Sequence, residues 1–130
     1  MVSSSPVGSL EELASQLVTE LPVRSLAESL SFYRSAGFRL VRATPTFGVL
    51  CWGDRYLFLT ERTGVSVGEH PANIRIVVGD VEGLFGQAEQ KGWRIRHPLA
   101  DRGYGLRDFT VLDPDGYEVR FAALAEPQAS

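Results

Sequence analysis

The sequence predicts an α+β fold of two tandem βαβββ modules, whose antiparallel or mixed sheets curve around a cleft. The first observation is an internal repeat. The segment that begins at Leu21 aligns without a gap on the segment that begins at Ile76, at an offset of 55 residues (76 − 21). The second is that each copy contains, in the same order, an apolar run, one helical stripe and further strands separated by turn residues.

The repeat is recognised by residue types that chance rarely aligns. A glycine, an aromatic residue and an arginine follow one another in both copies, as Gly37, Phe38 and Arg39 and as Gly92, Trp93 and Arg94. We therefore expect one domain over 17–123, built from modules 17–62 and 72–123 and flanked by an N-terminal extension (1–16) and a C-terminal tail (124–130). Ser9 and Glu12 could cap a short helix in the extension.

The first module begins with a strand near 17–23. Ser25 followed by Glu28 is a capping box, which marks the start of a helix. The helix carries one apolar stripe, and Gly37 stands where a helix end favours a left-handed residue. The stripe consists of Leu26, Leu30 and Tyr33. A strand follows Gly37, and two more are expected near 46–52 and 55–61, with a turn at Gly53-Asp54.

The second module repeats these signals. Asp80 can cap a helix, and Gly92 takes the place of Gly37. The apolar stripe of this helix consists of Val81, Leu84, Phe85 and Ala88. Strands near 105–112 and 117–122 are expected on either side of Asp113-Pro114-Asp115-Gly116, which is a strong turn signal.

Alternation along the strands separates residues that face a helix from residues that face the cleft. The predicted core set is Leu57, Leu59, Ile74, Ile76, Val78, Phe109, Val111, Val119 and Phe121. The opposite set mixes aromatic and charged side chains, as ligand pockets do. It consists of Val18, Glu20, Tyr56, Phe58, Asn73, Arg75, Asp108, Glu118 and Arg120.

Composition excludes several classes of function. The net charge of −3 comes without any cluster of Lys and Arg, so nucleic acid is not expected as a partner. No apolar run approaches the roughly 18 residues of a membrane-spanning helix, and residues 1–13 show no signal peptide. Cys51 is the only cysteine and cannot form an internal disulfide. A cytoplasmic location is therefore expected.

Two segments resemble one protein family over roughly residues 17–123. LPVRSLAESLSFYRSAGF near the start and YGLRDFTVLDPDGYEVRFA near the end look like the vicinal oxygen chelate superfamily. This superfamily includes glyoxalase I, extradiol dioxygenases, fosfomycin-inactivating enzymes and bleomycin-resistance proteins. The resemblance implies either a divalent metal in the cleft or a bulky ligand that is bound without metal.

Metal-dependent members carry His, Glu or Gln at four cleft positions on the first, fourth, fifth and eighth strands. The resemblance places Val18, Phe58, Asn73 and Arg120 there. Valine, phenylalanine and arginine are not metal ligands and asparagine is a poor one, so we expect neither a metal nor another cofactor. A displaced metal site made of Glu20, Glu118 and His70 is the alternative.

The chain resembles most closely the metal-free bleomycin-resistance branch, whose members sequester an antibiotic in a groove between two subunits. This implies a homodimer that binds a small molecule, for example a bleomycin-like antibiotic, with no catalytic residues. The candidate ligand-binding residues are Trp52, Tyr56, Phe58, Asn73, Arg75, Tyr104, Asp108, Glu118 and Arg120. Asp108 and Glu118 would suit a cationic ligand, whereas Arg75 and Arg120 would suit a zwitterionic or anionic one.

Three alternatives remain open at this point. The protein could be a lyase or dioxygenase with displaced metal ligands, or a metal-free enzyme that uses Glu20, Glu118 or Arg120. It could also be an interaction module whose cleft is filled by side chains. Separately, Tyr56 and Phe58 could pack against another subunit and not against a ligand. Arg120 could equally form an internal ion pair with Asp108 or Glu118.

Overall fold

The computed structural model of the protein describes residues 17–68, 70, 72–103 and 105–124. Two βαβββ modules follow one another, as predicted. The first contains β1 (Thr19–Val23), α2 (Leu26–Ala36), β2 (Arg39–Ala43), β3 (Phe47–Trp52) and β4 (Arg55–Glu61). The second contains β5 (Asn73–Val77), α3 (Val81–Gln90), β6 (Arg94–Asp101), β7 (Leu106–Leu112) and β8 (Glu118–Leu124). The chain divides between Ser66 and Val67 into two compact units, called unit 1 and unit 2 below.

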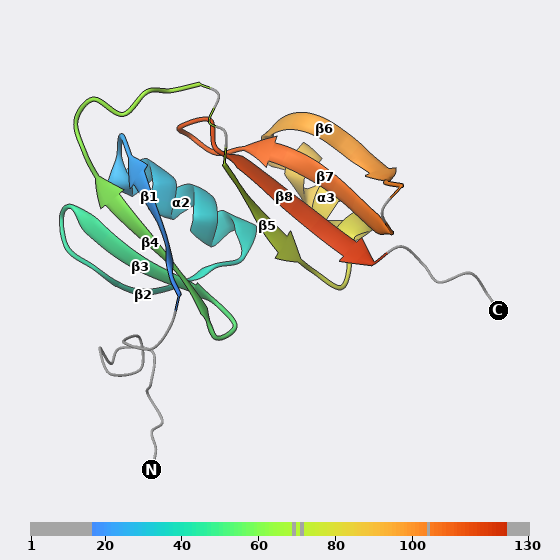
Figure 1. Ribbon diagram of the computed structural model, residues 1–130, viewed down its shortest axis with the longest axis horizontal. Helices are drawn as coiled ribbons and strands as arrows, with labels where there is room; N and C mark the ends of the chain where they lie inside the picture. The colour runs from blue at the N-terminus through green and yellow to red at the C-terminus, as the bar shows by residue number, and fades with distance from the viewer. Residues whose placement is uncertain (1–16, 69, 71, 104, 125–130) are drawn as a thin grey trace, which may run out of the picture. The chain divides into compact units, whose positions relative to one another are not determined.

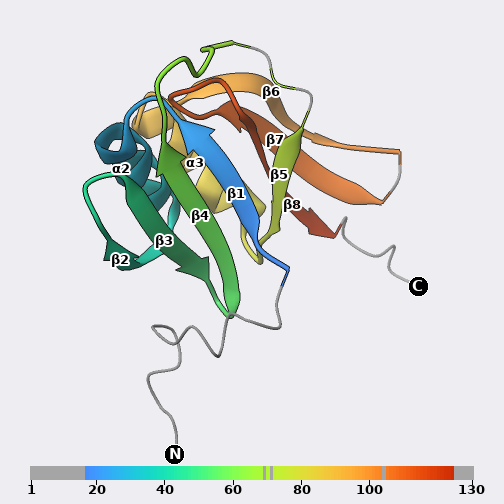
Figure 2. The same ribbon diagram turned by 60° about the vertical axis from the view of Figure 1, so that its left-hand side comes forward.

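Both units have the same topology. The strand order is β1-β4-β3-β2 in unit 1 and β5-β8-β7-β6 in unit 2. The first strand of each unit pairs in parallel with the fourth, and the other pairs are antiparallel. One helix lies along one face of each sheet (Figure 1), and Figure 2 shows β1 beside β4 from another side. Each sheet therefore has a second face that none of the described helices covers, called its helix-free face below.

Helix α2 starts and ends where the sequence predicts. The Ser25 hydroxyl accepts a hydrogen bond from the Glu28 amide at 3.2 Å, and Gly37 ends the helix with φ +119°. The second half of the capping box differs from the prediction, because the Glu28 carboxylate accepts from Arg24 at 3.2 Å. In unit 2 the Asp80 carboxylate caps α3 at the Gly83 amide, 2.9 Å away.

Aromatic side chains build the core of each unit between helix and sheet. Tyr33 of α2 is fully buried, and its ring contacts that of Phe38 edge to face at 5.4 Å. In unit 2 the Phe109 ring contacts Phe85 of α3 at 5.1 Å and Phe121 of β8 at 5.4 Å. These contacts are favourable both as buried apolar area and as aromatic pairs.

The predicted alternation holds along the strands. Most members of the predicted core set are buried, whereas Ile74 and Val78 are half-buried. A Cβ built on Gly48 would lie 3.0 Å from Leu30 of α2, which shows that Gly48 and its same-face neighbours point toward the helix. Cys51, of the opposite parity in β3, belongs to the helix-free face and is only 2% exposed.

The turn between β7 and β8 is buried, although turns usually lie at the surface. Asp113 and Asp115 are both fully buried. The Asp113 carboxylate oxygen Oδ1 accepts hydrogen bonds from the amides of Asp115 and Tyr117, each at 2.9 Å. A side-chain acceptor thus satisfies two buried backbone donors, which explains why aspartate begins this turn.

A segment that precedes β5 lies directly on this turn. The Gly68 amide donates to the Asp115 carbonyl at 3.2 Å, and the His70 ring stacks on Tyr117 at 4.0 Å. Gly116 has φ +89°, and a Cβ built on it would lie 2.1 Å from the Gly68 carbonyl oxygen. Only glycine fits here, because the position combines a left-handed backbone with a close backbone approach.

Candidate ligand-binding site

The helix-free face of unit 1 carries three aromatic side chains, Phe47, Tyr56 and Phe58. Tyr56 and Phe58 project from β4 on the face opposite Leu57 and Leu59, and both are half-buried. The Phe58 ring contacts the Phe47 ring edge to face at 5.2 Å. Glu20 of β1 lies beside Phe58 in the strand register. Its carboxylate accepts a hydrogen bond from the Thr60 hydroxyl at 2.6 Å, so this acid already has a neutral partner.

Trp52 lies on the other face of the same sheet. It pairs with Arg55, which has the same parity as the buried Leu57. The Trp52 ring contacts the Phe38 ring at 5.2 Å, and a Cβ on Gly37 would lie 3.0 Å from it. The structure therefore does not bring Trp52 together with Tyr56 and Phe58, and its ring packs below the end of α2.

The helix-free face of unit 2 carries a row of polar residues that crosses all four strands. Arg75 of β5 lies opposite Arg120 of β8, Arg120 lies opposite Thr110 of β7, and Thr110 lies opposite His97 of β6. Asn73 and Glu118 form the next pair along β5 and β8. Five of the predicted site residues, Asn73, Arg75, Asp108, Glu118 and Arg120, thus share one face. Tyr104 lies outside the described residues.

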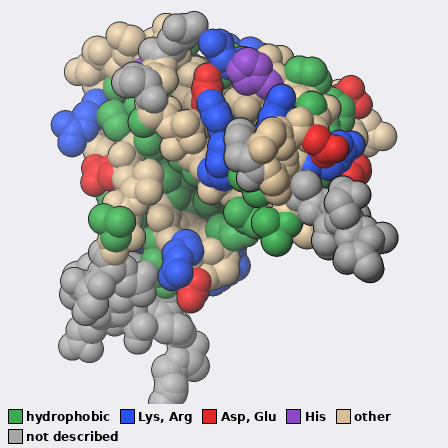
Figure 3. Space-filling view, turned by 45° about the vertical axis from the view of Figure 1, so that its right-hand side comes forward, with side chains coloured by type: hydrophobic (Ala, Val, Ile, Leu, Met, Phe, Trp, Pro, Cys, Tyr) green, Lys and Arg blue, Asp and Glu red, His purple; other side chains and the backbone are tan. Residues whose placement is uncertain are grey.

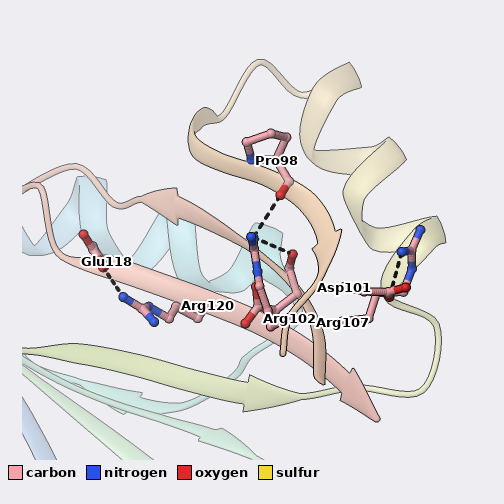
Figure 4. A network of polar contacts seen from close by, with 7 residues as sticks. Pro98, Asp101, Arg102, Arg107, Glu118 and Arg120 are labelled. Atoms are coloured by element: carbon pink, nitrogen blue, oxygen red, sulfur yellow. Dashed lines mark hydrogen bonds and ion pairs between the residues drawn. The ribbon is translucent and has the colours of Figure 1, made fainter. Parts of the chain in front are cut away.

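Glu118 is bound by arginines on both sides. Its Oε1 accepts from Arg120 Nη2 at 3.1 Å, and its Oε2 accepts from Arg96 Nε at 2.9 Å. Figure 4 shows Arg120 and Glu118 reaching toward each other along β8. The internal ion pair that was left open for Arg120 is therefore present, and its partner is Glu118. A cationic ligand group would have to displace two guanidinium groups at this carboxylate.

Asp108 is bound in a similar way by Arg102, a residue that sequence reasoning missed. The Asp108 side chain is almost fully buried, and its Oδ1 accepts from Arg102 Nε at 2.6 Å. Arg102 Nη2 also donates to the carbonyl oxygens of Pro98 and Asp108, at 3.1 and 3.2 Å. Figure 4 shows this arginine held beside β7. The buried carboxylate is compensated within its own hairpin, as a buried charge must be.

Arg107, the neighbour of Asp108, points to the opposite side of the sheet. Its guanidinium binds Asp101 at 3.0 Å and Glu82 of α3 at 2.8 Å. The hydrogen bond to Asp101, followed by the one to Glu82, raises the pKa of Arg107 above its usual value. Within the segment Leu106-Arg107-Asp108-Phe109, Arg107 thus attaches α3 to the β6–β7 hairpin, and Asp108 belongs to the helix-free face.

At least two pockets lined only by described residues open on unit 2. One has a volume of about 220 Å³ and is lined by His97, Arg102, Asp108, Thr110 and Arg120. The other has a volume of about 130 Å³ and is lined by Gly68, His70, Arg94, Arg96, Leu112, Gly116 and Glu118. We call the first the Arg120 pocket. Figure 3 shows basic and acidic side chains together with a histidine on one face of the molecule.

The residues present do not fit a divalent metal. In unit 1 the Phe58 ring occupies one position that the family resemblance assigns to a ligand, and in unit 2 Arg120 occupies another. A guanidinium repels a metal cation. Of the alternative ligands, Glu118 is bound to two arginines, and His70 Nε2 lies 3.0 Å from the Asp115 carbonyl oxygen. Over residues 17–124, apart from the three not described, no three His, Cys, Asp or Glu side chains gather in a metal-binding group.

The raised pKa of Tyr117 leads to a prediction of how the free energy of unfolding depends on pH. Burial raises the pKa of its phenol above 10.0, and the charges of Asp113 and Asp115 add to the rise. Above about pH 10 the unfolded chain releases this proton before the folded one does, so the free energy of unfolding falls as pH rises. We expect Tyr117→Phe to lose part of this slope between about pH 9 and about pH 11 in urea unfolding. Equal slopes for the two proteins would contradict the assignment.

The geometry defines an α+β protein of two tandem βαβββ modules with an aromatic face in one and a polar, arginine-lined face in the other. The profile of the Glyoxalase/Bleomycin resistance protein/Dioxygenase superfamily matches residues 15–121. The chain therefore belongs to this superfamily. A comparison with curated protein sequences gave no match.

Solved structures share the fold. A glyoxalase/bleomycin resistance protein/dioxygenase from Alicyclobacillus acidocaldarius is 23% identical, with a TM-score of 0.71 over 85% of this chain and 91% of that one. TioX from Micromonospora sp. ML1 is 25% identical, with a TM-score of 0.65 over 85% and 98%. A bleomycin-binding protein complexed with bleomycin is 22% identical, with a TM-score of 0.71 over 84% and 98%. Among the described helices, none is long and apolar enough to cross a membrane.

Proposed function

We propose that this protein binds and sequesters a small molecule without a metal ion and without chemical conversion. The observation that carries the proposal is the placement of Arg120. This residue takes a position where metal-dependent relatives would need a ligand, and it lies opposite Arg75 on the same face. Two arginines side by side oppose a divalent cation, whereas they suit the polar groups of an organic ligand.

The aromatic face of unit 1 supplies the second part of the proposal. Tyr56 and Phe58 are half-buried, so part of each ring is accessible to a ligand. Aromatic side chains and a few placed polar groups are the usual lining of small-molecule sites. Tyr56 and Phe58 of unit 1 are proposed as residues that stack on a ligand, and Asn73, Arg75, Asp108, Glu118 and Arg120 of unit 2 are proposed as residues that contact polar ligand groups.

Metal content is the first test. We expect less than about 0.1 equivalent of zinc, nickel, iron or manganese per chain, measured by elemental analysis of protein purified without chelator and again after metal reloading. About one tightly held equivalent would overturn the proposal. Glu20→Gln and Glu118→Gln would then be compared with the unmodified protein, because loss of that equivalent would identify the displaced metal site.

Ligand binding is then measured on the same purified protein after chelator has been added. A ligand of the folded state raises stability by RT ln(1 + [L]/Kd), about 2.7 kcal/mol at a hundredfold excess over Kd, and so raises the melting temperature. Metal-free bleomycin is the first probe, followed by other antibiotics. Mass spectrometry should recover the bound compound unchanged, and a converted compound would indicate an enzyme instead.

The proposed assembly is a homodimer in the cytoplasm, as in the branch that the sequence resembles. Light scattering of the purified protein gives its mass in solution and checks the dimer directly. A ligand-binding face that is completed by a second copy would make the apparent affinity depend on protein concentration.

A further inference from the structure

The charged side chains around the Arg120 pocket of unit 2 indicate which kind of ligand group the pocket binds. We propose that the Arg120 pocket binds an oxyanion of the ligand, a carboxylate or a phosphate, and not a cationic group. The inference rests on the proposed function, since it names the class of molecule that the protein would sequester. It reverses the role expected for Asp108 and Glu118 as partners of a cation.

The acidic side chains of this face are already neutralised. Asp108 is bound to Arg102 at 2.6 Å, and Glu118 is shared by Arg96 at 2.9 Å and Arg120 at 3.1 Å. These five side chains carry three positive charges and two negative ones. Their summed charge is therefore positive, and Arg75 on the same face adds a further positive charge. A cation would meet net repulsion here, and an anion would meet attraction.

Arg120 offers a donor that the fold leaves unused. Its Nε is buried and has no hydrogen-bond partner among the described residues. Nη2 is held by Glu118, so the guanidinium is fixed in place with its Nε edge unoccupied. A buried charged donor without an acceptor is costly, and an oxyanion that accepts from it removes this cost. Such hydrogen bonds to an ionised acceptor are the strong ones. Because Nε is closed to water, the oxyanion reaches it only when the side chains that cover it shift.

The other lining residues fit the same group. Thr110 is opposite Arg120 in the register and carries a hydroxyl that can donate, and His97 lies opposite Thr110. The volume of about 220 Å³ is smaller than that of pockets enclosing a drug-sized ligand. The pocket therefore accommodates one head group, with the remainder of the ligand outside it.

The charge of the ligand group that binds in the Arg120 pocket is tested with small probes that have nearly the same shape and different charges. Benzoate, benzamide and benzamidine are nearly isosteric and carry a negative, zero and positive charge, and phenyl phosphate replaces the carboxylate by a phosphate. Titrations are followed in NMR spectra that include the arginine Nε–Hε signals, with millimolar affinities expected for such small probes. Benzoate or phenyl phosphate should shift the Arg120 Nε–Hε signal, and whichever binds more tightly identifies the oxyanion. Benzamidine binding equally well or better would overturn the proposal.

Variants tie the binding to Arg120. Arg120→Gln should weaken benzoate or phenyl phosphate at least tenfold, whereas Arg55→Gln, which removes an equal charge from an exposed arginine of unit 1, should change it less than twofold. Arg120→Lys keeps the charge but removes the Nε donor, and we expect its loss of affinity for these anions to lie between those of the two glutamine variants. Dispersed NMR spectra confirm that each variant is folded. Unchanged binding in Arg120→Gln would overturn the proposal.

The outcome separates this inference from the proposed function. If benzoate and phenyl phosphate do not bind while metal-free bleomycin or another compound is sequestered unchanged, the charge assignment is wrong and the sequestering role stands. If the anions bind at Arg120 but a compound is converted or requires a metal, the pocket assignment stands and the sequestering role is wrong.

Discussion

Asp113→Ala is expected to destabilise the protein by about 2–4 kcal/mol, since the substitution leaves two buried amide donors without an acceptor. These are the amides of Asp115 and Tyr117, each 2.9 Å from the Asp113 oxygen Oδ1 in a turn that is itself buried. Water cannot replace the lost acceptor as it does at an exposed turn. Urea unfolding followed by circular dichroism measures the change.

Asp113→Asn is the matched control for this prediction. Asparagine keeps an oxygen at the place of Oδ1 and a similar shape, while it removes the charge. We expect it to lose less than half of what the alanine variant loses. Equal losses for the two variants would show that the charge, and not the two hydrogen bonds, is what the turn requires.

Gly116→Ala is expected to cost about 2–4 kcal/mol for two separate reasons. A left-handed backbone disfavours any Cβ, and here φ is +89°. The new Cβ would also lie 2.1 Å from the Gly68 carbonyl oxygen, so the segment that precedes β5 has to move away from the turn. That movement breaks the hydrogen bond from the Gly68 amide to the Asp115 carbonyl.

Gly105→Ala separates the two causes. Gly105 has φ +88° in the same unit, with nothing within 4 Å of an added Cβ, so this variant has only the backbone cost of about 1–2 kcal/mol. Hydrogen exchange at the Gly68 amide should accelerate in Gly116→Ala and stay unchanged in Gly105→Ala. If the two variants lost equal stability, the close approach of Gly68 would have no energetic role.

Local signals were sufficient to predict the fold from sequence. Ser25 and Asp80 cap the two helices, and Gly37 ends the first in a left-handed conformation. The constant offset between the copies then required the same topology twice. The strand β8 runs to Leu124, past its predicted end at 122, because no turn residue interrupts the alternation there. The predicted helix at Ser9 and the tail beyond 124 lie outside the described residues.

The candidate site was predictable only in part. Alternation placed Asp108, Glu118 and Arg120 on one face of unit 2, as the registers show. The pair of Arg120 with Glu118 was among the alternatives, whereas Arg96 and Arg102 were missed as partners of Glu118 and Asp108. Arg96 lies in β6 between Ile95 and His97, where the register is irregular, and Arg102 follows the end of β6. A bulge breaks the two-residue period on which the assignment of faces depends. The position of Trp52 could have been predicted from the two-residue turn at Gly53-Asp54. Such a turn pairs Trp52 with Arg55, and Arg55 points to the same face of the sheet as Leu57.

The position of Cys51 gives the chain a native reporter of how its two halves melt. This thiol is the only one in the chain and is only 2% exposed in β3 of unit 1, so a labelling reagent reaches it only when the structure around it opens. Asp113 and Gly116 both belong to unit 2. Faster thiol labelling in variants of that turn would mean that the two copies of the repeat unfold as one cooperative body, and an unchanged rate would mean that each copy keeps a stability of its own.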